Sequence, residues 1–199
     1  SHSSASSHRL EGDWNGNESV PANEGSIVAL TREYRLRAAT AADFDFVFAL
    51  HRAAMREYIE PIWGWHEDWQ EEYQRRKYAP ERYQIIVVEG HDAGVLVVES
   101  RADELYLGLI ELRPEDQSQG IGTRIVERLE RAASERGVPL TLHVLKTNIA
   151  ARRLYERLGF EVVEEEEVRY RMGCAPTKAG KPHQRAIDPH HRAPTQEEQ

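Results

Sequence analysis

A short segment with two glycines, Gln117-Ser-Gln-Gly-Ile-Gly122, has the composition of an anion-binding turn. Gly120 and Gly122 lack β-carbons where a helical pattern begins, so the backbone N–H groups there are accessible. The first N–H groups of a helix have no partner within the helix, and the helix dipole adds partial positive charge at that end. A phosphate is the ligand that such a turn favours, although a plain tight turn has the same glycine spacing.

A second segment, which runs from Asn148 to Phe160, places two polar side chains at helical spacing. Asn148 and Tyr155 differ by only about 20° around a helix axis and lie roughly 10 Å apart along it. Both side chains can therefore line one groove beside the glycine turn, where an elongated anion would fit. Two other interpretations stay open, since Asn148 is a typical helix cap and Tyr155 a typical core aromatic.

The hydrophobic periodicity predicts the elements that position these two segments. An apolar strand at 105–112 precedes the glycine turn, and a helix at 121–136 follows it, with a glycine C-cap at Gly137. Because this helix connects the strand at 105–112 to the one at 140–145, we expect that strand pair to be parallel. The full expected order is a strand at 34–37, a helix that begins near Thr40 and is stopped by Pro61, a helix before Pro80, strands at 83–89 and 95–100 around a hairpin turn at 90–94, the strand at 105–112, the helix at 121–136, the strand at 140–145, a helix at 148–158, and strands at 160–163 and 168–172.

Tryptophans cluster between the first two helices. Trp65, Trp69 and Tyr73 recur every four residues, and we expect Trp69 and Tyr73 to lie in the core. Trp63 and Trp65 flank Gly64 at the helix junction, so we predict that they form the wall of a pocket.

Composition limits the class of protein. The chain has 199 residues and a net charge of −8, which suits one domain and argues against a general nucleic-acid binder. No apolar run is long enough to cross a bilayer, and the N-terminus lacks the pattern of a secretory signal. The single cysteine, Cys174, falls in an expected tail and excludes an internal disulfide. We therefore expect a cytoplasmic protein with one domain at 33–172. The tails at 1–31 and 173–199 are expected to be unstructured, apart from a possible short extended piece at 27–30. The tail histidines His183, His190 and His191 are more typical of a solvated tail than of a metal site.

The two segments together resemble the GNAT superfamily of N-acetyltransferases. The resemblance covers residues 33–172 and rests on Gln117-x-x-Gly120-x-Gly122 followed by Asn148-x-x-Ala151-x-x-x-Tyr155-x-x-x-Gly159-Phe160. It implies an α+β fold of three layers, with one mixed, mostly antiparallel sheet of six to seven strands, a splayed parallel pair and four helices. It also implies that the turn holds the pyrophosphate of acetyl-CoA, that the pantetheine arm bonds the preceding strand, and that no metal takes part. The residues expected to contact acetyl-CoA are Ile110, Leu112, Gln117, Ser118, Gln119, Gly120, Ile121, Gly122, Thr123, Asn148, Ala151, Arg152 and Tyr155.

The resemblance implies that Tyr155 is the general acid that protonates the departing thiolate, and the chemistry of acetyl transfer supports this role. A phenol with a pKa near 10 is protonated at neutral pH and can donate to a thiolate with a pKa of about 8.5. A backbone N–H at Ile110 or Leu112 can polarise the thioester carbonyl, an effect worth about 3 kcal/mol. The transfer needs no covalent intermediate, which agrees with the lack of a cysteine nucleophile.

The general base and the acceptor are less clearly specified. Strict strand alternation places Glu104, Tyr106, Gly108, Ile110 and Leu112 on one face and Glu111 on the other. The resemblance implies a Glu or His as base on this strand, but Tyr106 and Gly108 stand where that side chain is expected, so we predict that Glu104 acts through water. His143 and His66 are weaker candidates. We expect the acceptor, a small-molecule or peptide amine, to contact Tyr58, Trp63, Trp65 and Tyr106, with Glu57, Glu60, Glu67 or Asp68 attracting its ammonium group.

Two other functions remain as alternatives. A binding module that senses acyl-CoA without turnover would share the glycine turn and explain the missing base. A nucleotide-phosphate enzyme is disfavoured, because the turn lacks the Lys-Ser/Thr pair of a P-loop. We expect neither nucleic acid nor membrane as a partner, and a homodimer is left open.

Overall fold

The computed structural model describes residues 32–177. The expected N-terminal tail at 1–31, with its extended piece at 27–30, lies outside the described residues, as do residues 178–199 of the expected tail at 173–199, with the three tail histidines. The elements are β1 (Tyr34–Ala38), α1 (Phe44–Trp63), α2 (Glu67–Lys77), β2 (Gln84–Val88), β3 (His91–Ser100), β4 (Leu105–Leu112), α3 (Ile121–Glu135), β5 (Leu140–Leu145), α4 (Ile149–Arg157), β6 (Glu161–Glu165) and β7 (Arg169–Cys174), with single 3-10 turns at Ala41–Asp43, Pro80–Arg82 and Pro114–Asp116. Their order agrees with the order predicted from the sequence.

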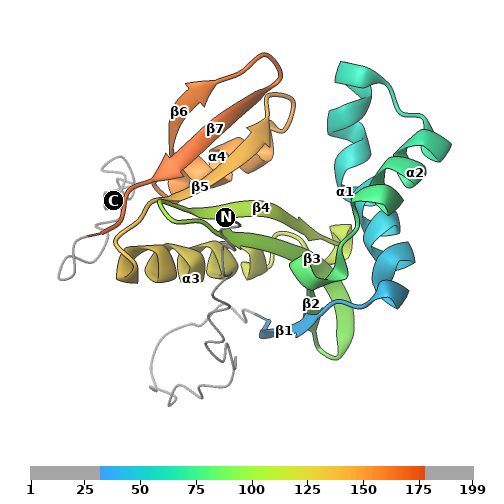
Figure 1. The fold of residues 1–199 in the computed structure, drawn as a ribbon, viewed down its shortest axis with the longest axis horizontal. Coiled ribbons are helices and arrows are strands. Elements are labelled where there is room, and N and C mark those ends of the chain that lie inside the picture. Colours follow the sequence, from blue (N-terminus) through green and yellow to red (C-terminus); the bar gives the residue numbers. More distant parts are fainter. Residues whose placement is uncertain (1–31, 178–199) are drawn as a thin grey trace, which may run out of the picture.

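One seven-stranded sheet has the order β1-β2-β3-β4-β5-β7-β6. All neighbours are antiparallel except β4 and β5, which run parallel as predicted and are paired only between residues 105–107 and 140–142. Beyond these residues the two strands diverge, and β5 turns away from β4 toward β7 (Figure 1). The sheet is therefore splayed at its centre, next to the start of α3.

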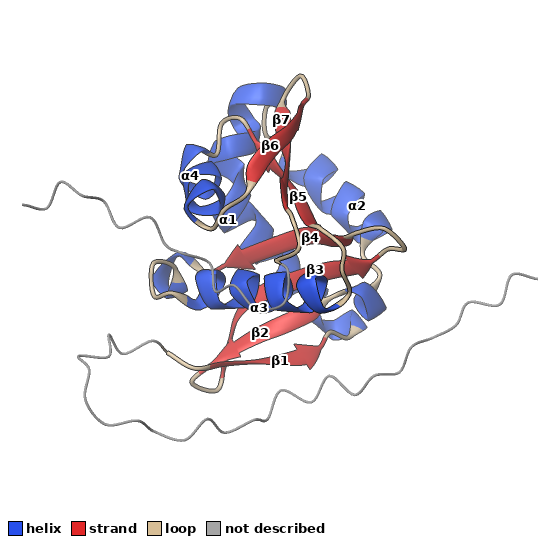
Figure 2. Cartoon of the chain, turned by 90° about the vertical axis from the view of Figure 1, so that its left-hand side faces the viewer, coloured by secondary structure: helices blue, strands red, loops and turns tan. Residues whose placement is uncertain are grey.

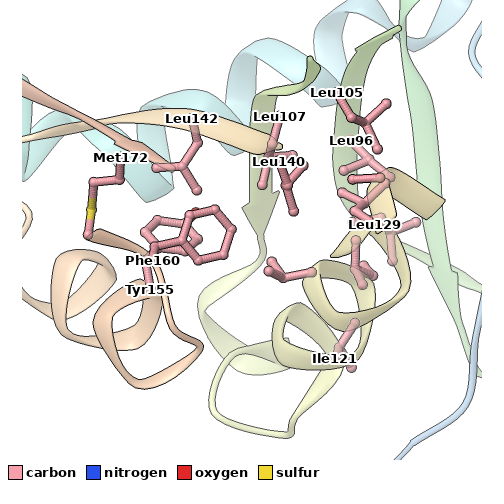
Figure 3. Packing of buried hydrophobic residues seen from close by; sticks show 14 of the residues in the cluster. Leu96, Leu105, Leu107, Ile121, Leu129, Leu140, Leu142, Tyr155, Phe160 and Met172 are labelled. Atoms are coloured by element: carbon pink, nitrogen blue, oxygen red, sulfur yellow. The ribbon is translucent and has the colours of Figure 1, made fainter. Parts of the chain in front are cut away.

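Helices cover both faces of the sheet (Figure 2). On one face, α3 and α4 enclose the main core, in which Ile121 and Leu129 of α3 belong to one cluster with Leu107 and Leu142 of the strands (Figure 3). On the other face, Val47 of α1 packs against Ile85 and Val87 of β2. Alternate residues of β2 thus supply both cores, because successive side chains of a strand point to opposite faces.

A β-bulge in β4 breaks its regular alternation. Val97 of β3 pairs with Leu109 and Val98 pairs with Leu107, which leaves Gly108 as an extra residue. Consequently Ile110 and Leu112 lie on the α3 face with Leu105 and Leu107, whereas Glu111 contacts α1. The strict alternation expected from the sequence, with Glu111 on the face opposite Tyr106, is therefore wrong.

Other sequence predictions also need correction. α1 continues through Pro61 to Trp63 and ends at Gly64, whose φ is 73°. β3 begins at His91, because Glu89 and Gly90 alone form the hairpin turn with positive φ. Cys174 is the last residue of β7, where it pairs with Leu140, and does not lie in a tail.

Trp69 and Tyr73 do not lie in the core. They are 55% and 40% exposed, and their rings stack on each other with centroids 5.2 Å apart. Gln70 is the one buried residue of α2. The helix therefore contacts the rest of the protein through a narrow face, and its aromatic stripe lies outside that face. Within residues 32–177, no helix has the length and apolar character of a membrane span.

Candidate functional site

The glycine turn is held in shape by the side chains of its two glutamines. Gln117 Nε2 donates to the carbonyl of Leu112 at 2.9 Å, and Gln119 Nε2 donates to the carbonyl of Glu115 at 2.6 Å. Gly120 precedes α3 in the left-handed conformation with φ 77°, which explains a glycine there. Ser118 also has a positive φ, 60°, which is uncommon for a residue with a β-carbon and marks a constrained turn.

The backbone N–H groups of residues 118–123 point to no acceptor in the part of the chain that the structure describes. The first backbone bond of α3 is the one that Arg124 N donates to Gly120 O at 3.0 Å. These unpaired donors and the positive end of the α3 dipole favour an anion with several oxygens. The turn thus has the properties of a phosphate site.

Buried groups beneath the turn anchor it to the sheet. Asp116, 1% exposed, accepts a hydrogen bond from His91 Nε2 at 3.0 Å and lies 3.7 Å from the Arg32 guanidinium. We did not anticipate this anchor from the sequence. The one available signal was an acidic residue beside an expected anion site. Such a carboxylate would repel the anion, so it needs a cationic or hydrogen-bonding partner of its own.

The open edge of β4 offers further donors to a ligand in the splay. Arg113 N donates to Ala93 O of β3 at 2.8 Å. Since backbone N–H groups alternate in direction along a strand, those of Leu112 and Ile110 point to the opposite, unpaired edge. The structure thus leaves the two predicted donors, Ile110 and Leu112, beside the opening between β4 and β5.

The residues at the start of α4 have local partners. Asn148 is the N-cap of α4, and its Oδ1 accepts a hydrogen bond from Ala151 N at 3.0 Å. Arg152 donates to Glu156 at 2.8 Å, and its guanidinium lies 4.4 Å from the ring of Tyr170 on β7. The contacts of Arg152 are therefore with α4 and β7, and no described contact joins it to the glycine turn.

Tyr155 lies in the main core, on the side of the sheet that α3 covers. It is 8% exposed, and its ring packs against Phe160 with centroids 5.6 Å apart (Figure 3). Burial raises the pKa of Tyr155 to about 12, so the phenol is protonated at neutral pH. Its hydroxyl has no hydrogen-bond partner among residues 32–177, which leaves it available to a ligand.

Glu104 is tied into a network of hydrogen bonds. It is 7% exposed and accepts bonds from Thr141 Oγ1 at 2.6 Å, Arg101 at 2.5 Å and Arg171 at 2.7 Å. Burial by itself would raise the pKa of Glu104, but these donors outweigh it and lower the pKa below its usual value. A carboxylate so stabilised is a poor proton acceptor, and the geometry favours a structural role over that of the predicted base.

Glu111 and His51 form a buried pair under α1. His51 Nδ1 and Glu111 Oε1 are 2.8 Å apart, and the side chain of Glu111 is 1% exposed. Its other oxygen, Oε2, is buried without a hydrogen-bond partner in the described residues. The signal that the sequence offered was a single acidic residue inside the apolar run Leu109-Ile-Glu-Leu112, which requires a buried partner.

Tyr106 and His143 lie together where β4 and β5 part. The Tyr106 hydroxyl is 3.0 Å from His143 Nδ1, and His143 Nε2 is 3.0 Å from Glu166 Oε1. His66, the other candidate histidine, is the residue preceding α2, and its side chain caps no N–H there.

Three of the four expected acceptor residues lie on α1 or the turn that follows it, whereas Tyr106 lies on β4. Trp63 is 59% exposed, and Trp65 donates its indole N–H to Glu67 at 2.7 Å. Tyr58 accepts a bond through its carbonyl from Thr147 Oγ1 at 2.8 Å. α1 therefore spans the open side of the splay. Its His51 contacts Glu111 of β4, and its Tyr58 carbonyl binds Thr147 in the turn after β5.

Two of the acidic residues expected to attract an ammonium group already have cationic partners. Glu67 pairs with Arg52 at 2.7 Å and Glu60 pairs with Arg56 at 3.2 Å. Among the described residues, no cluster of three or more His, Cys, Asp or Glu side chains could hold a metal ion.

Solved structures share this fold at low sequence identity. The PaiA N-acetyltransferase from Thermoplasma acidophilum, solved in complex with coenzyme A, is 18% identical over 72% of this chain and 99% of its own, with a TM-score of 0.59. PH1933 from Pyrococcus horikoshii OT3 is 18% identical over 73% of this chain and 100% of its own, with a TM-score of 0.57. The ribosomal-protein-S18-alanine N-acetyltransferase from Escherichia coli is 24% identical over 75% of this chain and 97% of its own, with a TM-score of 0.53.

No curated protein sequence matches this chain. Residues 47–160, however, match the acetyltransferase (GNAT) family. The matched range begins in α1 and ends just after α4, so it includes the glycine turn, the splayed strand pair and Tyr155. With its seven-stranded mixed sheet, its four helices and this match, the chain belongs to the acetyltransferase (GNAT) family.

Proposed function

We propose that the protein is an acetyl-CoA-dependent N-acetyltransferase that transfers the acetyl group directly to a primary amine of a small molecule or peptide. The observation that carries this proposal is the row of unpaired N–H groups at residues 118–123, beside the open edge of β4. Donors at the turn suit a pyrophosphate, and donors on the strand suit the amides of a pantetheine arm. The PaiA structure, which contains coenzyme A, supports the same ligand class.

Two groups of this chain, together with the splay between β4 and β5, perform the transfer. The N–H of Ile110 or Leu112 polarises the thioester carbonyl, and the splay holds the thioester close to the amine. Tyr155 donates its hydroxyl proton to the departing sulfur. Burial raises the pKa of Tyr155 to about 12, but the same loss of water destabilises a thiolate beside it, so the proton transfer depends on the difference between the two groups.

Calorimetry with acetyl-CoA and with S-acetylpantetheine tests the binding half of this proposal. We expect acetyl-CoA to bind at least about tenfold more tightly, because only acetyl-CoA presents a pyrophosphate to the turn. Equal affinity for the two ligands would contradict a phosphate role for residues 118–123.

Thiol release in the presence of propylamine, lysine or an alanine-initiated peptide tests the transfer half. We expect release above the hydrolysis rate with at least one of these amines. Tight binding of acetyl-CoA without release across a wider amine panel would favour the second candidate, an acyl-CoA-binding module without turnover. The specific observation in favour of that module is Glu104, whose carboxylate is saturated by three donors and does not provide the expected base.

A further inference from the structure

A chain of three hydrogen-bonded groups lies on the α1 face of the splay. The Tyr106 hydroxyl contacts His143 Nδ1 at 3.0 Å, and His143 Nε2 contacts Glu166 Oε1 at 3.0 Å. A carboxylate only accepts, so His143 carries its proton on Nε2, and Nδ1 is left to accept the phenol proton. The three groups are therefore aligned in one direction, from Tyr106 toward Glu166.

This chain begins where the sheet opens. Tyr106 pairs with Thr141 within the parallel ladder, and His143 is the first residue of β5 after the last paired position, Leu142. Beside the Tyr106 ring, Gly108 is exposed at the bulge, and a β-carbon there would lie 3.5 Å from the ring. Solvent thus reaches the centre of the sheet next to the phenol.

The chain ends at the surface. Glu166 lies in the turn between β6 and β7, and its side chain is 30% exposed. By contrast, the side chain of Glu111 in the His51 pair is 1% exposed, and Glu104 is held by three donors. Of these three acidic groups, Glu166 alone connects the splay to solvent through an imidazole; its second oxygen, Oε2, accepts a bond from Arg169 Nε at 2.6 Å.

The charges around His143 keep its imidazole neutral. Burial lowers the pKa of His143, and Arg169 and Arg171 of β7 lower it further, whereas Glu166 raises it. Burial raises the pKa of Tyr106, with opposing effects from Arg101 and Arg169 that lower it and from Glu99 and Glu104 that raise it. At neutral pH the phenol is protonated and the imidazole is free to accept its proton.

We propose that Tyr106, His143 and Glu166 form a relay that carries a proton from the acceptor ammonium to solvent. This inference rests on the proposed function and replaces Glu104, the base predicted from the sequence, with Tyr106 backed by His143, which the sequence offered only as a weaker candidate. Tyr106 is its catalytic residue, since its oxygen meets the substrate nitrogen. His143 and Glu166 act through Tyr106.

The proton balance of the transfer closes with two protons lost from the ammonium nitrogen. The first passes to the Tyr106 oxygen as the Tyr106 proton moves to His143 Nδ1, and the imidazolium releases its Nε2 proton to solvent beside Glu166. His143 is then protonated on Nδ1, and exchange with solvent, which gives a proton to Nε2 and takes one from Nδ1, restores the starting tautomer before the next turnover. The free amine attacks the thioester carbon, the C–N bond forms, and the C–S bond breaks with its electron pair on sulfur. Sulfur takes the Tyr155 proton, and Tyr155 recovers a proton from the new amide nitrogen.

NMR of the full chain labelled with 15N-histidine tests the relay without an acceptor. We expect neutral His143 to carry its proton on Nε2, and its pKa to fall in Glu166→Gln because the carboxylate that raises it is gone. Glu165→Gln is the matched control, because Glu165 is the preceding residue but pairs with Lys146, and it should leave the pKa of His143 unchanged. A proton on Nδ1, or the same pKa in both variants, would overturn the relay.

The pH dependence of kcat/KM, measured with whichever of propylamine, lysine or the alanine-initiated peptide reacts fastest, gives the second test. We expect the acidic limb to move to lower pH in Glu166→Gln and to stay in place in Glu165→Gln. Tyr106→Phe and His143→Gln should lower kcat about 100-fold with the KM for acetyl-CoA within about twofold. If the wild type turns over but the acidic limb stays in place in Glu166→Gln, the relay is wrong and the proposed function stands.

If the wild type binds acetyl-CoA and acetylates no amine in a broad panel, the proposed function fails and the relay fails with it. The two failures are therefore distinct. Variants are compared only where their thermal unfolding matches that of the wild type, and Glu166→Gln, a change in an exposed turn, keeps the test available even if Tyr106→Phe does not fold.

Discussion

The two faces of the β4–β5 splay differ in kind. The face covered by α3 and α4 is apolar: it holds a continuous core in which Tyr155 is a rare polar residue without an internal hydrogen bond. The face toward α1 is polar, with the His51–Glu111 pair and the Tyr106–His143–Glu166 chain. The apolar face thus leaves the Tyr155 hydroxyl without a protein partner, whereas the polar side chains of the α1 face form hydrogen bonds with one another.

This difference corresponds to the two halves of the proposed transfer. A coenzyme needs unpaired donors on a rigid apolar support, since every donor already used by the protein is lost to the ligand. Deprotonation of an amine needs connected acceptors that lead to water. The predictions below test this division, from the largest expected effect to the smallest.

Truncation of the apolar face should cost the most stability. Leu129 is 2% exposed in the main core, so we expect Leu129→Ala to lower the free energy of unfolding by about 3 kcal/mol. Urea denaturation followed by circular dichroism measures this loss. A cost below about 1 kcal/mol would show that the face is not the tightly packed support described here.

Removal of the phenol should affect chemistry on the same face without affecting binding. We expect Tyr155→Phe to lower kcat about 100-fold, because the sulfur loses its proton donor, while the affinity for acetyl-CoA changes less than about twofold. Stopped-flow thiol release and calorimetry measure the two quantities. A variant with wild-type kcat would remove Tyr155 from the role of acid and leave the fold assignment intact.

Glu104 should behave as a structural group with a pH-dependent contribution. We expect Glu104→Gln to lower the free energy of unfolding by about 2 kcal/mol at neutral pH. The pKa of Glu104 is lowered in the fold, so its stabilising effect is present above the unfolded pKa of about 4.3 and is lost as pH falls through the folded value. The difference between the wild type and the variant should therefore shrink in acid.

Chemical denaturation at neutral and acidic pH measures that difference. Glu99→Gln is the control, since Glu99 also binds Arg101 but is more exposed, and we expect it to cost less than about 1 kcal/mol. A Glu104→Gln protein with wild-type stability and strongly reduced kcat would instead restore Glu104 as a candidate base.

Gly122 should separate stability from binding. A β-carbon at Gly122 would meet only Leu112 Cδ1, at 3.9 Å, so Gly122→Ala should stabilise α3 by about 0.5–1 kcal/mol. The same β-carbon lies among the unpaired N–H groups, and we expect acetyl-CoA affinity to fall about tenfold. Thermal unfolding and calorimetry on one sample would show both changes, and unchanged affinity would place the ligand elsewhere.

The exposed aromatic pair of α2 should matter least. Trp69 is 55% exposed and stacks only on Tyr73 in the described structure. We expect Trp69→Ala to change the free energy of unfolding by less than about 0.5 kcal/mol. A larger cost would mean that α2 packs more tightly than its exposed residues indicate.

Local patterns in the sequence predicted the apolar face well. The two glycines, the helical spacing of Ile121, Ile125 and Leu129, and the turn from Tyr155 to Phe160 each depend on residues close together in the chain. Helix periodicity places such residues without knowledge of the rest of the fold. The order of the elements and the parallel strand pair followed from the same patterns.

The polar face was harder to predict, because its groups meet through long-range contacts. Tyr106, His143 and Glu166 come from two strands and a turn that are far apart in the sequence. Glu111 was assigned to the wrong face, since one extra residue in β4 reverses every later side chain. The stripe of Trp69 and Tyr73 was misassigned because spacing alone does not show whether a partner surface exists.

By itself the sequence indicated the family, the parallel strand pair and a turn suited to a phosphate, because these depend on short motifs, glycine positions and local periodicity. The tertiary structure decided which acidic and aromatic side chains meet. The physical reason is long-range strand pairing: the bulge at Gly108 turns Glu111 toward α1, and the short β4–β5 ladder brings Tyr106 beside His143. Neither pairing has a signature in the pattern of one strand.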